Sequence, residues 1–211
     1  MWIAKYFGRL DSLVCSAGIA DKGRLNESTT RKVLATNVFG TAAVIKALIP
    51  TLMRSPGSAR VVIVASQRGH LGLVSGEALT QVETAAIGPG ASVAKVEAVG
   101  RAYEALRLLR SGDASTQKSP SLVESGWPEG DVYGVSKLLG VAFAKALANE
   151  LHNDNVNAVA VCPGWCKTDM GSSMAPRSVS EGAKTISHLA CANFSDLEKG
   201  AFYRDGASVK W

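Results

Sequence analysis

The sequence predicts an α/β fold in which helices cover both faces of a doubly wound, mostly parallel sheet. Strand-like apolar runs alternate with amphipathic helical stretches, an order typical of parallel sheets joined by helical crossovers. The run "ARVVIVAS" (59–66) is apolar and β-branched almost throughout, as expected of a strand buried on both faces. With 211 residues, 46% of them hydrophobic, the chain can bury one substantial core. We therefore expect a single unit over residues 1–211.

The first half of the chain predicts a strand, a helix, a second strand and an irregular insertion. "LDSLVCSAG" (10–18) ends an apolar run in small residues, as a strand opening into a loop does. Apolar residues then recur at helical spacing over about 28–54, which predicts one long helix before the strand at 59–66. The pattern loosens afterwards, and we expect an insertion over about 71–130. Its parts are an amphipathic helix at 92–112 and a Ser-rich polar loop at 113–126.

The second half predicts two helices and two strands. In open parallel sheets the ligand lies outside the carboxyl ends of the strands. The strand ends at 16–18, 66–69 and 163–168 should therefore converge on one crevice. The expected elements are a helix at about 131–152, a strand at 156–163, a loop at 165–178, a helix at 178–191 and a strand-like stretch at 200–206.

Composition and charge argue against several classes of protein. The chain has 23 Lys and Arg against 18 Asp and Glu, without basic runs, which weakly favours an anionic small ligand and argues against nucleic acid. Four scattered cysteines without a secretory signal predict free thiols in a reducing, cytoplasmic compartment. No uninterrupted apolar run reaches the roughly 18 residues of a membrane helix, so we expect no membrane span.

Tyr133 and Lys137 are the first candidates for chemistry. They stand four residues apart at the start of a predicted helix, so their side chains emerge on the same face. A cation beside a phenol favours the phenolate and should lower the pKa of the tyrosine from its usual value near ~10. Such a tyrosine can donate and accept protons. The same spacing also occurs on ordinary solvated helix faces, and the pair alone does not decide between the two.

Ser66 and Asn37 are the next candidates. Ser66 ends the buried strand and places a hydroxyl at the expected crevice, although a serine can also simply terminate a strand. Asn37 is a poor helix former inside the long predicted helix. It could face water, or it could face inward, where its amide would need hydrogen-bond partners.

These segments together resemble the short-chain dehydrogenase/reductase family, and more narrowly its monomeric carbonyl reductases. The resemblance rests on "SAG" after a strand, "TNVFGT", the strand ending at Ser66, "YGVSK", "CPGWCKTDM" and the terminal Trp211. It covers essentially the whole chain, and it implies a Rossmann-like fold, NADPH as cofactor and small-molecule ketones, aldehydes or quinones as substrates. The inserted helical segment in this branch implies a monomer.

The resemblance also implies roles for individual residues. Tyr133 would donate the proton to the carbonyl oxygen as hydride arrives, and Lys137 would lower its pKa and bind the nicotinamide ribose. Ser66 would polarise the substrate carbonyl, and Asn37 would hold a water in the proton relay behind Lys137. The residues that would line the cofactor, besides Tyr133 and Lys137, are Ser16, Ala17, Gly18, Pro163, Gly164, Trp165 and Thr168, with Trp165 also beside the substrate.

The sequence departs from the family pattern in three places. No Gly-x-x-x-Gly-x-Gly phosphate turn is present, so we expect the chain to lack the first β-α units of the fold. What remains would be a contiguous half of the sheet, with an exposed strand edge that could pair with a partner. The family's Asn-Asn-Ala-Gly is Cys15-Ser16-Ala17-Gly18 here, and the residues before Ser66 include Ile63 and Ala65 instead of the usual Asn and Ser.

Other functions compete with the reductase hypothesis. A catalytically silent fragment could act as a binding or regulatory module through the exposed edge, and the missing phosphate turn favours that alternative. A serine hydrolase using Ser66 and His70 lacks Gly-x-Ser-x-Gly. A metal site is not expected, because the three histidines are isolated from each other and from the cysteines. Cys162 could be a reactive thiol, although a buried structural cysteine is the better interpretation.

Overall fold

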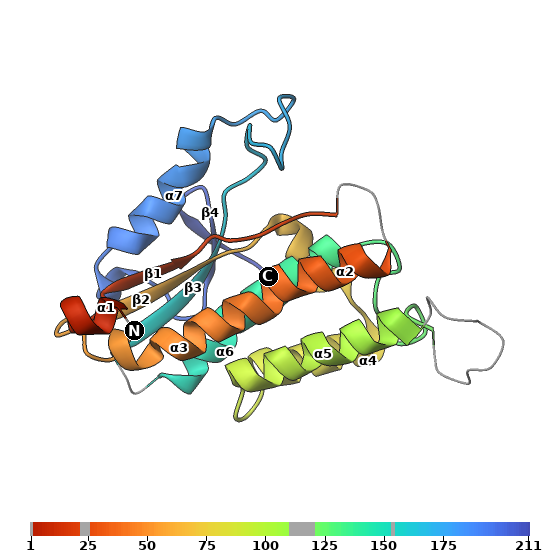
Figure 1. The fold of residues 1–211 in the computed structure, drawn as a ribbon, viewed down its shortest axis with the longest axis horizontal. Helices are drawn as coiled ribbons and strands as arrows, with labels where there is room; N and C mark the ends of the chain where they lie inside the picture. The colour runs from red at the N-terminus through yellow and green to blue at the C-terminus, as the bar shows by residue number, and fades with distance from the viewer. Residues whose placement is uncertain (1, 22–25, 110–120, 153–154) are drawn as a thin grey trace.

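The computed structural model describes residues 2–21, 26–109, 121–152 and 155–211, and within them it holds one five-stranded sheet with helices on both faces (Figure 1). The strands run in the order β1-β2-β3-β4-β5. The first four are parallel, and β5 returns antiparallel to β4. The α/β fold class is thus confirmed. The strands are β1 (Ser12–Cys15), β2 (Ala59–Val64), β3 (Val156–Cys162), β4 (Phe202–Arg204) and β5 (Ala207–Val209).

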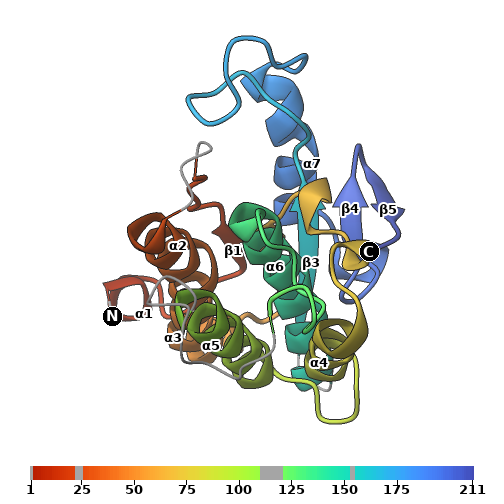
Figure 2. The ribbon, with the colours of Figure 1, turned by 90° about the vertical axis from the view of Figure 1, so that its right-hand side faces the viewer.

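The helices form two unequal layers (Figure 2). One layer holds the helices between β1 and β3, and α7 covers the other face against β1 and β2. β3 lies in the middle of the sheet and is buried at all of its positions, as a strand packed on both sides must be. The helices are α1 (Trp2–Tyr6), α2 (Glu27–Leu34), α3 (Thr41–Leu52), α4 (Gly76–Ala86), α5 (Val93–Leu109), α6 (Val132–Glu150) and α7 (Val179–Cys191).

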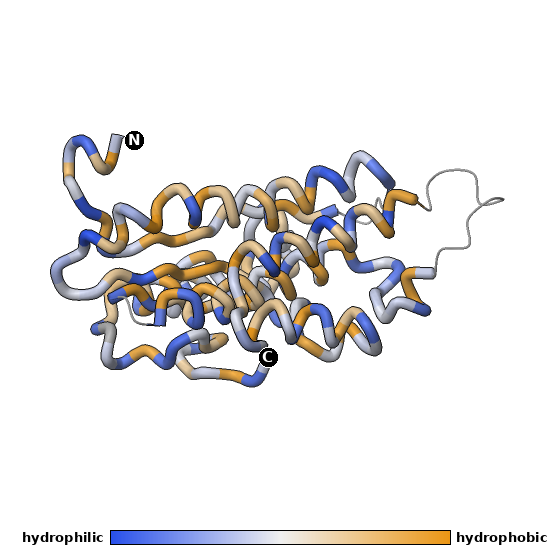
Figure 3. Tube along the Cα trace, turned by 90° about the horizontal axis from the view of Figure 1, so that it is seen from below, coloured by the Kyte–Doolittle hydropathy of each residue, from blue (hydrophilic) through white to orange (hydrophobic). Residues whose placement is uncertain are grey.

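The two faces of the sheet bury alternate residues of the same strands. Val61 and Ile63 of β2 join the larger core with α3, α5 and α6. Val62 joins the smaller core, together with Val159 of β3 and Leu189 of α7. This is the two-residue period of a β-strand. Apolar residues accordingly run along the central strands, while the helices alternate apolar and polar stretches (Figure 3).

The long predicted helix is continuous over Glu27–Leu52 but changes its geometry in the middle. A π-helical turn, Ala35–Gly40, separates α2 from α3. This segment is also long and apolar enough to cross a membrane, with a mean hydropathy of 1.6 in its most apolar window. Lys46 interrupts its apolar run, and the absence of a membrane span stays a prediction. In the structure Val33, Val38 and Ile45 of this helix are fully buried in the larger core.

Several elements were not expected from the sequence. The insertion contains α4 as well as α5, and the strand-like 200–206 is the first arm of a β4–β5 hairpin. Two predicted boundaries moved by a few residues, because β2 ends at Val64 and β3 at Cys162. Most of the predicted Ser-rich loop, residues 113–126, falls outside the described residues.

Candidate active site

Ser66 lies just beyond the carboxyl end of β2, where the chain leaves the sheet. Its extended backbone starts a short 3-10 turn, and its Oγ accepts a hydrogen bond from the backbone N–H of Arg68 at 3.2 Å. The turn closes at Gly69, which packs directly on α6: a Cβ there would lie 2.3 Å from the backbone nitrogen of Leu138. Only a glycine allows this approach, and the approach sets Ser66 beside the start of α6.

Tyr133 stands in the first turn of α6, next to Ser66. The helix is capped by Asp131, whose Oδ1 accepts from the backbone N–H of Gly134 at 2.7 Å. The tyrosine is half-buried, and the side chain of Ser66 is close enough to its hydroxyl to lower the pKa of the phenol. Two hydroxyl groups that are 67 positions apart in the sequence thus lie near each other in the fold.

Lys137 projects from the same face of α6, one turn further into the protein. It is 7% exposed, and its Nζ donates to the backbone carbonyl of Val64 at 2.8 Å and lies 5.7 Å from the centroid of the Tyr133 ring. Burial disfavours the ammonium form and lowers the pKa of Lys137 to about 8, although the nearby Cys162 thiol partly opposes the shift. A Cβ at Gly18 would lie 3.3 Å from this Nζ, so the loop after β1 closes over the amine.

Asn37 faces inward from the π-helical turn and is 5% exposed. Its amide nitrogen donates to the carbonyl of Ile19 and to the Oγ of Ser136, each at 2.9 Å. Its amide oxygen accepts from the backbone N–H of Ile19 at 2.8 Å. Both N–H donors are therefore engaged, and the side chain ties the loop after β1 to α6. A water held by this amide could only donate to it.

The expected effect of Lys137 on Tyr133 needs a correction. Burial raises the pKa of Tyr133, and the opposing influences are the hydrogen bond from Ser66 and the charge of Arg68. The simple pairing argument failed because it ignored desolvation, which acts on both members of the pair. Ser66 and Arg68 are the groups that offset the burial of the phenol.

The buried ammonium of Lys137 should make stability depend on pH. Because its pKa is about 8 in the folded chain and near the ordinary 10.5 when unfolded, the unfolded state holds more protons between these values. The free energy of unfolding should therefore rise with pH across this window. We compare the free energy of unfolding of the parent chain with that of Lys137→Met by urea titration. Between pH 8 and pH 10 this difference should shift in favour of the parent chain by about 1–3 kcal/mol. Lys184→Met, at an exposed position of α7, is the matched control; equal gains in both comparisons would contradict the prediction.

The segment after β3 reaches the crevice through Cys162. This thiol is 4% exposed, and its Sγ accepts from the backbone N–H groups of Gln67 and Gly164, both at 3.4 Å. The contacts join the turn after β2 to Pro163 and Gly164, and the burial fits a structural thiol. Gly164 has a φ of +78°, and a Cβ there would meet the guanidinium of Arg177 at 2.7 Å.

Four of the predicted cofactor residues lie on outer loops, away from Ser66, Tyr133 and Lys137. Trp165 and Thr168 form hydrogen bonds within their own loop. Trp165 Nε1 donates to the backbone carbonyl of Gly171, and Thr168 Oγ1 accepts from the backbone N–H of the same residue. Their loop extends beyond the end of the sheet towards α7 (Figure 2). Ser16 and Ala17 are exposed on the loop after β1. Among the described residues, no hydrogen bond connects any of the four to Ser66, Tyr133 or Lys137.

The chain matches known proteins over its whole length. Residues 1–80 match the family described as short chain dehydrogenase, and residues 98–192 match the one described as Enoyl-(Acyl carrier protein) reductase. Carbonyl reductase [NADPH] 1 of Mus musculus is 34% identical over 100% of this chain and 73% of its own length. The chain belongs to the short-chain dehydrogenase/reductase family. It is a reductase of the carbonyl-reductase type.

Further relatives of this reductase agree with the fold. (+)-Neomenthol dehydrogenase of Capsicum annuum is 31% identical over 84% of this chain and 52% of its own length. The structure of salutaridine reductase from Papaver somniferum superimposes with a TM-score of 0.77 at 25% identity, over 96% of this chain and 75% of that one. An NADPH-bound carbonyl reductase from chicken fatty liver has a TM-score of 0.59 at 19% identity, over 100% and 70%.

The residues around Lys137 suit one end of a dinucleotide. Gly18 leaves room beside Lys137 and Asn37 that a Cβ would fill, and the donors of Tyr133 and Lys137 suit the hydroxyls of a ribose. These residues fit the nicotinamide end of NADPH. The Gly-x-x-x-Gly-x-Gly turn that would receive the pyrophosphate is not among the 211 residues.

Sequence reasoning missed three residues of the site. Ser136 lies between the two quoted residues of "YGVSK" and accepts from Asn37. Arg68 and Arg177 stand on the segments after β2 and β3. The charge of both arginines and the position of Arg68 shortly after β2 were visible signals, but which group each would face depended on the packing.

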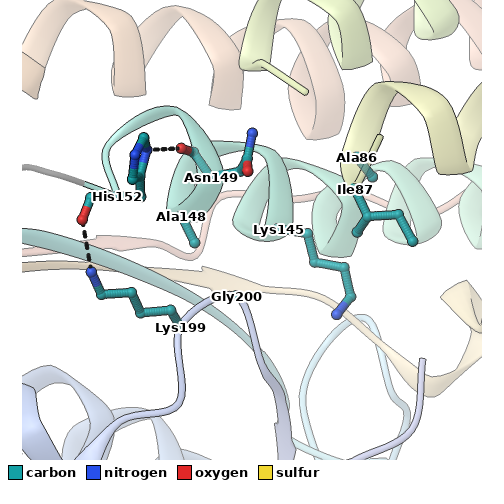
Figure 4. Close-up of a pocket in the computed structure, with 8 residues that line it drawn as sticks. All are labelled: Ala86, Ile87, Lys145, Ala148, Asn149, His152, Lys199 and Gly200. Carbon is teal, nitrogen blue, oxygen red and sulfur yellow. Dashed lines mark hydrogen bonds between the residues drawn. The ribbon is translucent and has the colours of Figure 1, made fainter. Parts of the chain in front are cut away.

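A separate pocket of about 290 Å³ lies near the carboxyl end of α6 (Figure 4). None of the predicted site residues lines it, since Tyr133 and Lys137 lie nearer the opposite end of this helix. Its lining residues are Ala86, Ile87, Lys145, Ala148, Asn149, His152, Lys199 and Gly200.

Proposed function

We propose that this chain reduces ketones, aldehydes or quinones to alcohols with NADPH, using Ser66, Tyr133, Lys137 and Asn37. The observation that carries the proposal is the packing of the Ser66–Gly69 turn on α6, which sets the hydroxyls of Ser66 and Tyr133 near each other with the buried amine of Lys137 behind them. Relatives that are named carbonyl reductase [NADPH] support the choice of cofactor and substrate class.

The two hydroxyls act on the substrate oxygen. Ser66 donates a hydrogen bond that polarises the carbonyl, and Tyr133 donates the proton as negative charge develops on the oxygen. Because both groups are held by the packing of Gly69 on α6, they require little reorganisation during the reaction. When bound, NADPH supplies the hydride.

Lys137 and Asn37 support the tyrosine from behind. The ammonium of Lys137, 5.7 Å from the Tyr133 ring, favours the phenolate that remains after proton transfer. Asn37 keeps the loop after β1 against Ser136, which leaves Gly18 over the amine. In this proposal Gly18, Pro163 and Gly164 border the nicotinamide, while Ser16, Ala17, Trp165 and Thr168 approach it from the outer loops.

The proposal is tested by cofactor binding and turnover of the purified chain. We expect NADPH to bind, as seen by its fluorescence, and its absorbance to fall when menadione or an aromatic aldehyde is added. Ser66→Ala should lower kcat about 10²-fold, the typical effect of removing one donor to the developing oxyanion. Absence of NADPH binding at millimolar cofactor would overturn the proposal and favour the silent binding module.

We also propose that the chain is a cytoplasmic monomer. Light scattering tests whether β1, at the edge of the sheet, pairs two copies of the chain.

A further inference from the structure

Arg68 presents a cation at the reacting end of the candidate site. It follows Ser66 by two residues, and its backbone N–H donates to the Ser66 Oγ. Its guanidinium carbon lies 5.6 Å from the centroid of the Tyr133 ring, and 62% of its side chain is exposed. A substrate whose carbonyl sits between the hydroxyls of Ser66 and Tyr133 therefore has this guanidinium within reach of its other end.

The ion-pair partner of Arg68 is Asp131, which also caps α6. Arg68 Nη2 lies 2.9 Å from Asp131 Oδ1, and the same oxygen caps α6 by accepting from Gly134 at 2.7 Å. A guanidinium has five N–H donors, and this ion pair engages one edge of it. The pair is also at the surface, where water competes for both charges.

The other charged groups near the crevice do not oppose an anion beside Arg68. Lys137 is a second cation below the tyrosine. Arg204 contacts Gln67, the residue between Ser66 and Arg68, and also pairs with Asp205. Asp205 is in turn held by Arg177 at 2.8 Å. Each of the two carboxylates, Asp131 and Asp205, thus faces an arginine.

We propose that Arg68 selects carbonyl substrates that carry a carboxylate a short distance from the reacting carbonyl. This inference rests on the proposed function and narrows its substrate class to oxo acids and similar anionic carbonyl compounds. The substrate carboxylate would take the free donors of the guanidinium, while Asp131 continues to cap α6. The preference should be modest, because an exposed ion pair changes an affinity by about two- to fivefold.

The test compares 3- and 4-formylbenzoate with their methyl esters, which keep the ring and the aldehyde but lack the charge. The measured quantity is the ratio of kcat/KM for the acid to kcat/KM for its methyl ester. In the parent chain this ratio should exceed one for at least one isomer, and added salt should reduce it. Arg68→Gln should lower the ratio about two- to fivefold, with Arg68→Lys in between. Asp131→Asn keeps a good helix cap but frees the guanidinium, so it should raise the ratio.

These outcomes separate the inference from the proposed function. If neither the formylbenzoates nor menadione is reduced, the proposed function fails, and ligand-observed NMR of acid and ester binding to the same variants still tests Arg68. Equal preference in the parent chain and Arg68→Gln, by rate or by binding, would overturn the inference. Opposite shifts in Arg68→Gln and Asp131→Asn would support it, because a purely structural role of the ion pair predicts the same direction for both.

Discussion

Tyr133→Phe should lower kcat for carbonyl reduction by about 10²–10⁴-fold, the usual contribution of a positioned general acid. The substitution removes only the hydroxyl beside Ser66, and it leaves a ring of the same size at the start of α6. Binding of NADPH should change little. Steady-state rates with menadione, together with a fluorescence titration of the cofactor, measure both quantities.

A matched tyrosine shows whether the effect is specific. Tyr103 is fully buried in the larger core, with its ring 4.8 Å from that of Trp127. Burial raises the pKa of its hydroxyl far above the ordinary value. Tyr103→Phe should leave kcat close to that of the parent chain. A Tyr133→Phe variant that keeps more than about a tenth of the parent kcat would contradict the role proposed for the hydroxyl.

Gly69→Ala should impair both folding and turnover. The new Cβ would lie 2.3 Å from the backbone nitrogen of Leu138 and from the carbonyl carbon of Lys137, so the turn must move away from α6. We expect the free energy of unfolding to fall by about 1–3 kcal/mol, the usual cost of overpacking. Because Ser66 moves with the turn, kcat should fall about 10²-fold as well, as small misplacements of a reacting group do.

The control for this prediction is Gly57→Ala. A Cβ at Gly57 would have no atom within 4 Å, and the residue lies between α3 and β2, in the loop before the strand that leads to Ser66. Urea titration and steady-state kinetics of this variant should match the parent chain. If Gly69→Ala behaves like Gly57→Ala, the close approach of the turn to α6 does not position Ser66.

The sequence predicted the parts of the fold that depend on local patterns. The continuous apolar run at 59–66 predicted the buried strand β2, and the helical spacing over about 28–54 predicted the helix that holds α2 and α3, because burial on both faces or on one stripe leaves a direct mark on residue order. The first four strands also lie side by side in chain order, as expected of a contiguous half of the sheet. The helix α4 was missed because its residues mix with a loosened, polar region, and β5 because three residues carry no detectable period.

The sequence by itself determined which residues could perform chemistry: a tyrosine and a lysine on one helical face, a serine after a strand and an asparagine inside a helix. Tertiary structure alone decided which of them meet. It brought Ser66 to Tyr133 through the contact of Gly69 with α6, turned Asn37 inward at a π-helical turn, and placed the unpredicted Arg68 beside the phenol. It also reversed the expected pKa shift of Tyr133. The physical reason is that burial and long-range contacts arise from packing between segments far apart in the chain, and no local pattern encodes the desolvation they impose.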